Sequence, residues 1–288
     1  MTVNIGRIGI WSIEVRFGDR AEAADAAAEL EDLGYGAIWT PGGVGGEVLA
    51  DIDFLLAATS RAAIATGILN VWKHEPADVA GWWKALPADK QDRVLLGLGV
   101  SHAPLIGDDY VHAKPLTVMR DYLDQLSEAG LPTERATCLA ALRAKMQELA
   151  RDRTTGAHPF LVTPEHSARA RAVLGPGKLL APEQGVVLDS NPDTARATAR
   201  GALEQYLQFP NYVNSWLALG FAQDEITQMS DRFVDALFAW GSADKIAERV
   251  NAHLAAGADH VCMQVITGAG VDFGPARQAW RELAKALL

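Results

Sequence analysis

Short apolar segments alternate along the chain with segments of helical periodicity. The apolar segments predict strands, and glycine or proline beside the amphipathic stretches marks predicted helix ends. Because the strands are apolar nearly throughout, they are typical of parallel strands that helices cover on both sides. The strands are expected at 7–12, 36–40, 62–72, 93–100, 159–163, 178–183, 186–189 and 260–266. The helices are expected at 21–34, 51–60, 115–130, 139–153, 164–175, 275–288 and within 192–256.

This alternation predicts an α/β fold, and a length of 288 residues suits a (β/α)8 TIM barrel. One part of the pattern departs from a regular barrel. Only two residues separate 178–183 from 186–189, whereas a parallel crossover needs about a dozen. Either these segments form one long bent strand, or they form a hairpin, or a βα unit has been trimmed. We therefore expect an irregular barrel at 178–190, within a single domain of residues 1–288.

Composition and charge narrow the classes of function. The net charge is −10, and no basic patch emerges that would bind nucleic acid. Cys138 and Cys262 are far apart and form no CxxC pair, so we expect neither a disulfide scaffold nor a metal site. No apolar run reaches the ~18 residues of a membrane span, and no signal-peptide pattern opens the chain. We expect a cytoplasmic protein with no membrane partner.

The carboxyl ends of barrel strands carry the active site, and this rule selects candidate residues. Gly97 and Gly99 end an apolar strand, and Ser101 and His102 follow them. Glycine lets another molecule approach the backbone, although a turn and core packing would need the same glycines. His102 titrates near neutral pH and is a candidate general acid or base, or a loop histidine bonded to a backbone carbonyl. The glycine-rich loop 41–46 either cradles a ligand or is a flexible connection.

Two other features at predicted strand ends suggest ligand contacts. Trp11, Trp39 and Trp72 follow or end predicted strands. Together they would form a pocket wall for a planar substrate, whereas core packing is the alternative for each. Thr163 stands at a predicted helix start, where free N–H groups attract an anion. Glu165 would repel that anion, so a capped helix without a ligand is the alternative there.

Several stretches together resemble a known family. The stretches "IATGILNVWKHEPADVA" (64–80), "VLLGLGVSHAPLIG" (94–107) and "KPLTVMRDYLDQL" (114–126) resemble the bacterial luciferase-like monooxygenase superfamily. They look most like its branch that uses coenzyme F420, an 8-hydroxy-5-deazaflavin. Residues 30–43 and 252–266 are similar to that family's second and last strand regions. The resemblance implies a TIM barrel that holds a deazaflavin ring, or alternatively FMN, at its carboxyl face.

The resemblance also implies roles for individual residues. In relatives a bulge in the third strand, often with a non-prolyl cis peptide, supports the ring, and the matching stretch is 66–70. The fourth-strand motif, here 97–102, lies along the ring, and His102 takes the place of an acidic proton-transfer residue. Relatives hold the cofactor phosphate with the loop after the fifth strand, where we expect Thr163 and His166 to reach it. The remaining cofactor contacts that the resemblance implies are Gly67, Ile68, Asn70, Gly97, Gly99, Val100 and Ser101.

The sequence thus predicts a coenzyme F420-dependent oxidoreductase that transfers hydride between the deazaflavin and a small organic substrate. One alternative is an FMN-dependent monooxygenase of the same superfamily. Another is a non-catalytic cofactor-binding protein on a degenerate barrel. By analogy with the family we expect a homodimer.

Overall fold

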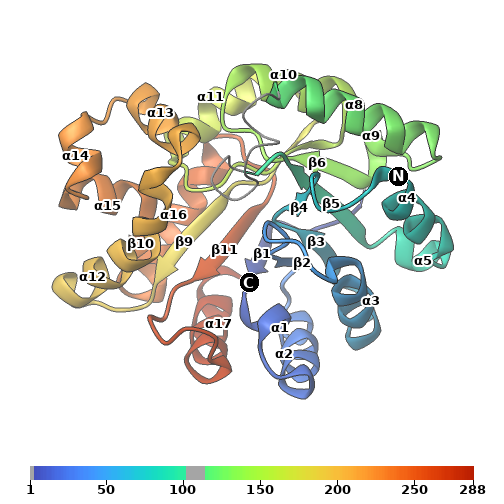
Figure 1. Cartoon of the computed structure of the whole chain (residues 1–288). Coiled ribbons are helices and arrows are strands. Elements are labelled where there is room, and N and C mark those ends of the chain that lie inside the picture. The colour runs from blue at the N-terminus through green and yellow to red at the C-terminus, as the bar shows by residue number, and fades with distance from the viewer. Residues whose placement is uncertain (1–2, 102–113) are drawn as a thin grey trace.

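The computed structural model describes residues 3–101 and 114–288. His102 lies outside this part of the chain, so its predicted proton-transfer role stays a prediction. A curved sheet of parallel strands forms the centre of the molecule (Figure 1). The strands are β1 (Ile8–Trp11), β2 (Ala37–Thr40), β3 (Ala63–Thr66), β4 (Leu69–Asn70), β5 (Val94–Gly99), β6 (Thr137–Leu139), β7 (Gly156–Ala157), β8 (Leu179–Leu180), β9 (Glu183–Val187), β10 (Phe238–Trp240) and β11 (Val261–Val265).

Helices surround the sheet, and α12 to α15 extend to one side of it (Figure 1). The first group is α1 (Glu14–Phe17), α2 (Arg20–Asp32), α3 (Val48–Ala58), α4 (Pro76–Ala85), α5 (Ala88–Gln91), α8 (Pro115–Glu128), α9 (Thr133–Ala136), α10 (Ala144–Arg153) and α11 (Pro164–Leu174). The second group is α12 (Pro192–Leu203), the 3₁₀ helix η1 (Glu204–Gln208), α13 (Pro210–Leu219), α14 (Gln223–Thr227), α15 (Asp231–Leu237), α16 (Ala243–Ala255) and α17 (Phe273–Leu287).

The barrel closes along the continuous segment 179–187. On one edge, the backbone N–H groups of Leu179, Ala181 and Glu183 donate to carbonyls of the β7 segment. On the other edge, Pro182 accepts from Cys262, and β9 then pairs in parallel with β11. Of the three alternatives for 178–190, the structure agrees best with one long bent strand, which Ala181 and Pro182 divide into β8 and β9. The predicted TIM barrel is confirmed, with the short strand β10 added beside β9.

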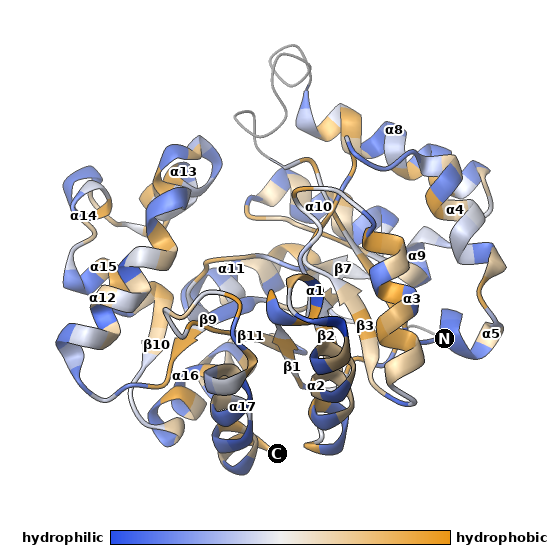
Figure 2. Ribbon diagram, turned by 60° about the horizontal axis from the view of Figure 1, so that its bottom comes forward, coloured by the Kyte–Doolittle hydropathy of each residue, from blue (hydrophilic) through white to orange (hydrophobic). Residues whose placement is uncertain are grey.

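The alternation of side chains along each strand divides the core into two layers. Outward residues such as Ile38, Ile64 and Leu96 pack against the helices. Inward residues are mostly small and form a second cluster, which leaves room for a large side chain such as Trp39 inside the barrel. The inward cluster contains Ile5, Trp11, Ala37, Trp39, Ala63, Ala65, Leu95, Cys138, Ala181 and Cys262. The outer faces of α2 and α17 are hydrophilic, as Figure 2 shows.

Two of the predicted elements were wrong. The helix predicted at 139–153 begins only at Ala144, and residues Thr137–Leu139 form β6, the fifth strand along the barrel. The strand predicted at 159–163 is irregular backbone beyond the two-residue strand β7. Alanine and leucine at 139–142 favour a helix by propensity, whereas parallel pairing with β5 makes Thr137–Leu139 a strand. The strand β10 was also missed, within a region predicted as helical.

Within the part of the chain that the structure describes, no helix has both the length and the apolar character needed to cross a bilayer.

Close backbone packing at Gly97 yields a first testable prediction. A Cβ atom at Gly97 would lie 2.0 Å from the carbonyl oxygen of Thr66 in the neighbouring strand. Because backbone must move to relieve this overlap, Gly97→Ala should lower the free energy of unfolding by roughly 3 kcal/mol. The matched control is Gly81→Ala in α4, where a Cβ meets nothing within 4 Å. The control should raise stability by about 0.5–1 kcal/mol. Urea unfolding measures both, and equal stabilities would contradict the packing argument.

Candidate active site

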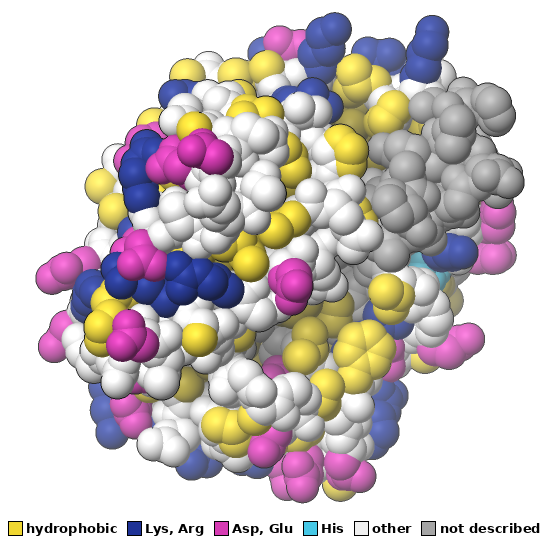
Figure 3. All heavy atoms as spheres, turned by 60° about the vertical axis from the view of Figure 1, so that its left-hand side comes forward, with side chains coloured by type: hydrophobic (Ala, Val, Ile, Leu, Met, Phe, Trp, Pro, Cys, Tyr) yellow, Lys and Arg dark blue, Asp and Glu magenta, His cyan; other side chains and the backbone are white. Residues whose placement is uncertain are grey.

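A cavity of about 390 Å³ opens at the carboxyl ends of the barrel strands. This volume lies within the usual range of small-molecule sites. The molecular surface in this region is hollowed, and hydrophobic side chains are visible in the hollow (Figure 3). The residues that line the cavity are Trp11, Phe17, Pro41, Gly43, Val44, Gly67, Ile68, Gly99, Val100, Ser101, Ala140, Ala141, Leu142, His158, Phe160, Gln205, Tyr206, Gln208, Phe209, Asn211 and Tyr212.

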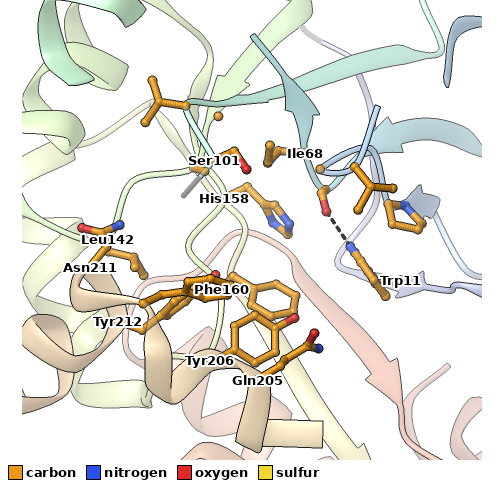
Figure 4. A pocket seen from close by; sticks show the side chains of 18 of the residues that line it. Trp11, Ile68, Ser101, Leu142, His158, Phe160, Gln205, Tyr206, Asn211 and Tyr212 are labelled. Atoms are coloured by element: carbon orange, nitrogen blue, oxygen red, sulfur yellow. Dashed lines mark hydrogen bonds between the residues drawn. The ribbon is translucent and has the colours of Figure 1, made fainter. Parts of the chain in front are cut away.

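The interruption between β3 and β4 forms one wall of the cavity. The peptide bond between Gly67 and Ile68 is cis, so the predicted strand-3 bulge and its non-prolyl cis peptide are both present. Trp11 donates its indole N–H to the carbonyl of Gly67 at 3.1 Å (Figure 4). A Cβ on Gly67 would meet that indole nitrogen at 2.4 Å, and one on Gly99 would meet Ile68 at 2.7 Å. Both glycines thus keep this wall free of extra side-chain atoms.

The glycine-rich loop 41–46 is held against the cavity by two polar side chains. Arg16 donates to the carbonyls of Pro41 and Gly45, and it is ion-paired with Asp51 at 3.0 Å. Asn70 donates its amide N–H to the carbonyl of Gly43 at 2.8 Å. Asn70, predicted to contact the cofactor, therefore supports a loop that lines the cavity.

Aromatic rings form the opposite wall. Phe160 lies 5.9 Å from Trp11 and 5.7 Å from Tyr206, measured between ring centroids. Tyr206 is in turn 5.2 Å from Tyr212. Figure 4 shows Phe160, Tyr206 and Tyr212 grouped on the side of the cavity away from Ile68. The apolar faces of these rings suit a planar ligand.

A second cavity of about 670 Å³ adjoins the first. The two share Trp11, Phe160, Gln205 and Tyr206 as lining residues. The second cavity also contains Glu14, whose carboxylate accepts a hydrogen bond from the Ser12 hydroxyl. Burial raises the pKa of Glu14, and the bond from Ser12 opposes that shift. The adjoining cavity thus contains a carboxyl whose pKa burial raises.

His158 reaches the cavity from inside the barrel. Its ring stacks on Trp39 with 4.1 Å between centroids, and its Nδ1 lies 2.7 Å from the carbonyl oxygen of Ala181. Trp39 in turn donates its indole N–H to His260. Burial lowers the pKa of His158 to about 4, although the bond to Ala181 acts in the opposite direction. His158 is therefore a neutral imidazole at ordinary pH.

Glu183 lies fully buried in the interior. One of its carboxylate oxygens accepts from the backbone N–H of Leu161 at 3.0 Å, and the other has no partner within the described part of the chain. Burial raises the pKa of this carboxyl to about 8, which the bond from Leu161 only partly offsets. At neutral pH the folded protein therefore holds Glu183 mostly protonated.

Of the twelve predicted site residues that the structure describes, six line the cavity: Trp11, Gly67, Ile68, Gly99, Val100 and Ser101. The other six do not line it, and Asn70 supports the loop 41–46 as described above. Trp72 donates its indole N–H to the carbonyl of Val100, and Gly97 packs against β3. Trp39 is buried beside His158. Thr163 caps α11, and the imidazole of His166 contacts the carbonyl of Leu142 at 2.8 Å.

Sequence reasoning missed three groups at the cavity. The loop after β6 contributes Ala140, Ala141 and Leu142, and it was hidden inside a predicted helix. The segment 205–212 follows α12 and comprises most of η1 and the start of α13, and it carried no recognisable motif. His158 was missed because only its contact with Ala181 indicates a role at the cavity. Ala181 lies 23 residues further along the chain, so no local sequence pattern shows this contact. Because the fifth strand is Thr137–Leu139, the loop after the fifth strand is 140–143 and not the segment that begins at Thr163.

Comparisons with known proteins agree with this architecture. Residues 9–137 match the model of the luciferase-like monooxygenase family. An F420-dependent secondary alcohol dehydrogenase, solved in complex with an F420-acetone adduct, has a TM-score of 0.72 at 15% identity. The alignment covers 100% of this chain and 98% of that chain. The coenzyme F420-dependent tetrahydromethanopterin reductase from Methanopyrus kandleri has a TM-score of 0.67 at 14% identity. There the coverage is 100% and 99%.

A third solved structure binds a flavin. The oxygenating constituent of 3,6-diketocamphane monooxygenase from Pseudomonas putida, in complex with FMN, has a TM-score of 0.70 at 16% identity. The alignment covers 98% of this chain and 99% of that chain. The search of curated proteins gave no match. The fold is thus that of a luciferase-like α/β barrel. The resemblance to the luciferase-like monooxygenase superfamily that the sequence predicts is confirmed over residues 9–137, which match the family model.

The protonated state of Glu183 yields a second prediction. Between pH 4.5 and about 8 the folded carboxyl keeps its proton, whereas the unfolded carboxyl loses it. The wild type therefore loses stability with rising pH in this window. Glu183→Gln removes this loss, so the variant's stability relative to wild type should rise by up to about 1.4 kcal/mol per pH unit. Urea unfolding of both proteins at several pH values measures the difference.

Glu31→Gln is the control for this experiment. Burial raises the pKa of Glu31, but the backbone N–H groups of Ala62 and Arg61 outweigh it and lower the pKa to about 2. From about pH 5.5, one unit above the unfolded pKa, to pH 8, Glu31 is thus ionised in both states, and in this range its variant should differ from wild type by a constant amount. A constant difference for Glu183→Gln as well would contradict the buried, protonated carboxyl.

Proposed function

We propose that this protein is a coenzyme F420-dependent oxidoreductase that transfers hydride between the deazaflavin and a small organic substrate. Its structural relatives are oxidoreductases and monooxygenases, and two of them use F420 according to their descriptions. The observation that carries the proposal is the cavity between the Gly67–Ile68 wall and the aromatic wall around Phe160.

The residues present fit a planar, hydrogen-bonding cofactor. Side chains at Gly67 and Gly99 would overlap Trp11 and Ile68, so these positions keep the wall flat. The Nε2 atom of His158 is a buried polar atom that has no partner in residues 3–101 and 114–288. Gly67, Ile68, Gly99, Val100 and Ser101 would hold the ring, as the resemblance predicts. When bound, the deazaflavin would supply the hydride acceptor or donor.

The start of α10 is the expected phosphate contact in this proposal. The loop 140–143 follows the fifth strand β6, which is where relatives hold the phosphate according to the predicted resemblance. Ala140 to Leu142 line the cavity, and the backbone N–H groups at the start of α10 attract an anion. Arg143 adds a positive charge beside Asn211, a lining residue to which it donates at 3.2 Å.

The protein's own contribution is orientation, exclusion of water and proton management. The loop 41–46, fixed by Arg16 and Asn70, covers one side of the cavity, and the aromatic wall covers another. Burial raises the pKa of Glu14 in the adjoining cavity, so this carboxyl binds a proton more readily than a free carboxyl does. The proton-transfer role of His102 stays a prediction.

An FMN-dependent monooxygenase is the second candidate. The observation that favours it is the likeness to the Pseudomonas putida oxygenating constituent in complex with FMN. The same apolar walls suit a flavin ring, so the cofactor has to be identified by binding.

Titration of the purified protein with F420, and separately with FMN, tests the proposal. Trp11 lines the cavity, so binding should quench tryptophan fluorescence. We expect micromolar or tighter binding of F420 and much weaker binding of FMN. Gly99→Val should weaken the binding at least ~10-fold, because its side chain would enter the space at Ile68.

Gly81→Val, on the surface of α4, is the matched control and should bind F420 as the wild type does. A preference for FMN would replace the first candidate by the second. Binding of neither ring would contradict both candidates.

A further inference from the structure

The imidazole of His158 has a fixed tautomer. Its Nδ1 lies 2.7 Å from the carbonyl oxygen of Ala181, and a carbonyl can only accept. Nδ1 therefore carries the ring proton. The low pKa of His158, about 4 because of burial, means that no second proton is bound at neutral pH. Nε2 is consequently a bare lone pair that accepts and does not donate.

The ring is also fixed in orientation. Trp39 stacks on it with an angle of 19° between the ring planes, and Trp39 is itself held by its N–H bond to His260. His260 completes the series by contacting the carbonyl of Gly6 through its Nδ1. His158 is only 1% exposed, so the imidazole has little room to turn toward another partner.

The bare nitrogen is buried beside the Gly67–Ile68 wall of the cavity that His158 lines. An ideal Cβ on Gly67 would lie 3.1 Å from Nε2, which places this atom beside the Gly67–Ile68 wall. Figure 4 shows the imidazole projecting into the space between Ile68, Trp11 and Phe160. Nε2 has no hydrogen-bond partner among the described residues. An unpaired buried acceptor costs about 1–3 kcal/mol, and a ligand donor would recover that cost.

We propose that His158 Nε2 accepts a hydrogen bond from a ring N–H of the bound ligand and so determines specificity for ligands that carry this donor. The inference deepens the proposed function and rests on it for the choice of probe. Oxidised flavins and 5-deazaflavins carry one such N–H, the imide group of the pyrimidine ring. A ligand with this N–H replaced by N–CH₃ would leave the lone pair unpaired and would also crowd it.

Two matched ligands and two variants test this role. The probes are the 5-deazaflavin chromophore and its N3-methyl analogue, each titrated by quenching of tryptophan fluorescence. Wild type should bind the methylated probe at least ~10-fold more weakly. His158→Phe keeps an aromatic ring beside Trp39 but removes the acceptor, so it should bind the two probes with nearly equal affinity. His158→Gln retains an acceptor oxygen and should keep part of the preference.

A second measurement needs only the wild type, so it can be interpreted even if a variant fails to fold. The ¹⁵N resonance of His158 Nε2 should shift when the unmethylated chromophore binds, and it should shift less with the methylated one. Two results would contradict the inference: the same preference for the unmethylated probe in wild type and His158→Phe, or an unchanged Nε2 resonance. Neither result would contradict the proposed cofactor. If wild type binds neither this chromophore nor FMN, both the proposed function and the inference are contradicted.

Discussion

The backbone of segment 179–187 is hydrogen-bonded on both of its edges, and the barrel and the cavity depend on it together. One edge joins β7 and the other joins β11, so the sheet closes here without a further crossover helix. The same segment supplies the carbonyl of Ala181 that fixes His158, and the carboxyl of Glu183 that accepts from Leu161. His158 and Phe160 follow β7 and flank Pro159, whose carbonyl accepts from the N–H of Glu183 in this segment. Closure of the barrel therefore also sets the inner end of the cavity.

The barrel interior contains several buried polar side chains, among them His158, Glu183 and His260. Small inward residues leave space that Trp39 and two histidines fill, and each histidine donates its Nδ1 proton to a backbone carbonyl. Burial lowers the pKa of both histidines to about 4, so these groups stay neutral. The outcome is a rigid polar support under an otherwise apolar cavity. Such a support holds a lone pair in place without placing a charge beside a ligand.

The sequence predicted the barrel and much of one cavity wall, because apolar strands and glycines at strand ends are local signals. The strand-3 bulge and the strand-4 glycine Gly99 lie where they were expected. The fifth strand was not predictable in the same way, since residues 137–153 are rich in alanine and leucine and suit a helix equally well. That error displaced the expected phosphate loop by one strand. His158 and the segment 205–212 reach the cavity through contacts between distant parts of the chain. A local sequence pattern cannot predict such contacts.

A crystal structure of the protein with bound coenzyme F420 tests the central claim most directly. The account predicts that the deazaflavin ring lies against Gly67 and Ile68, with a ring N–H within hydrogen-bonding distance of His158 Nε2. A ring in the adjoining cavity beside Glu14, or a crystal saturated with F420 that shows no ring at either place, would contradict it.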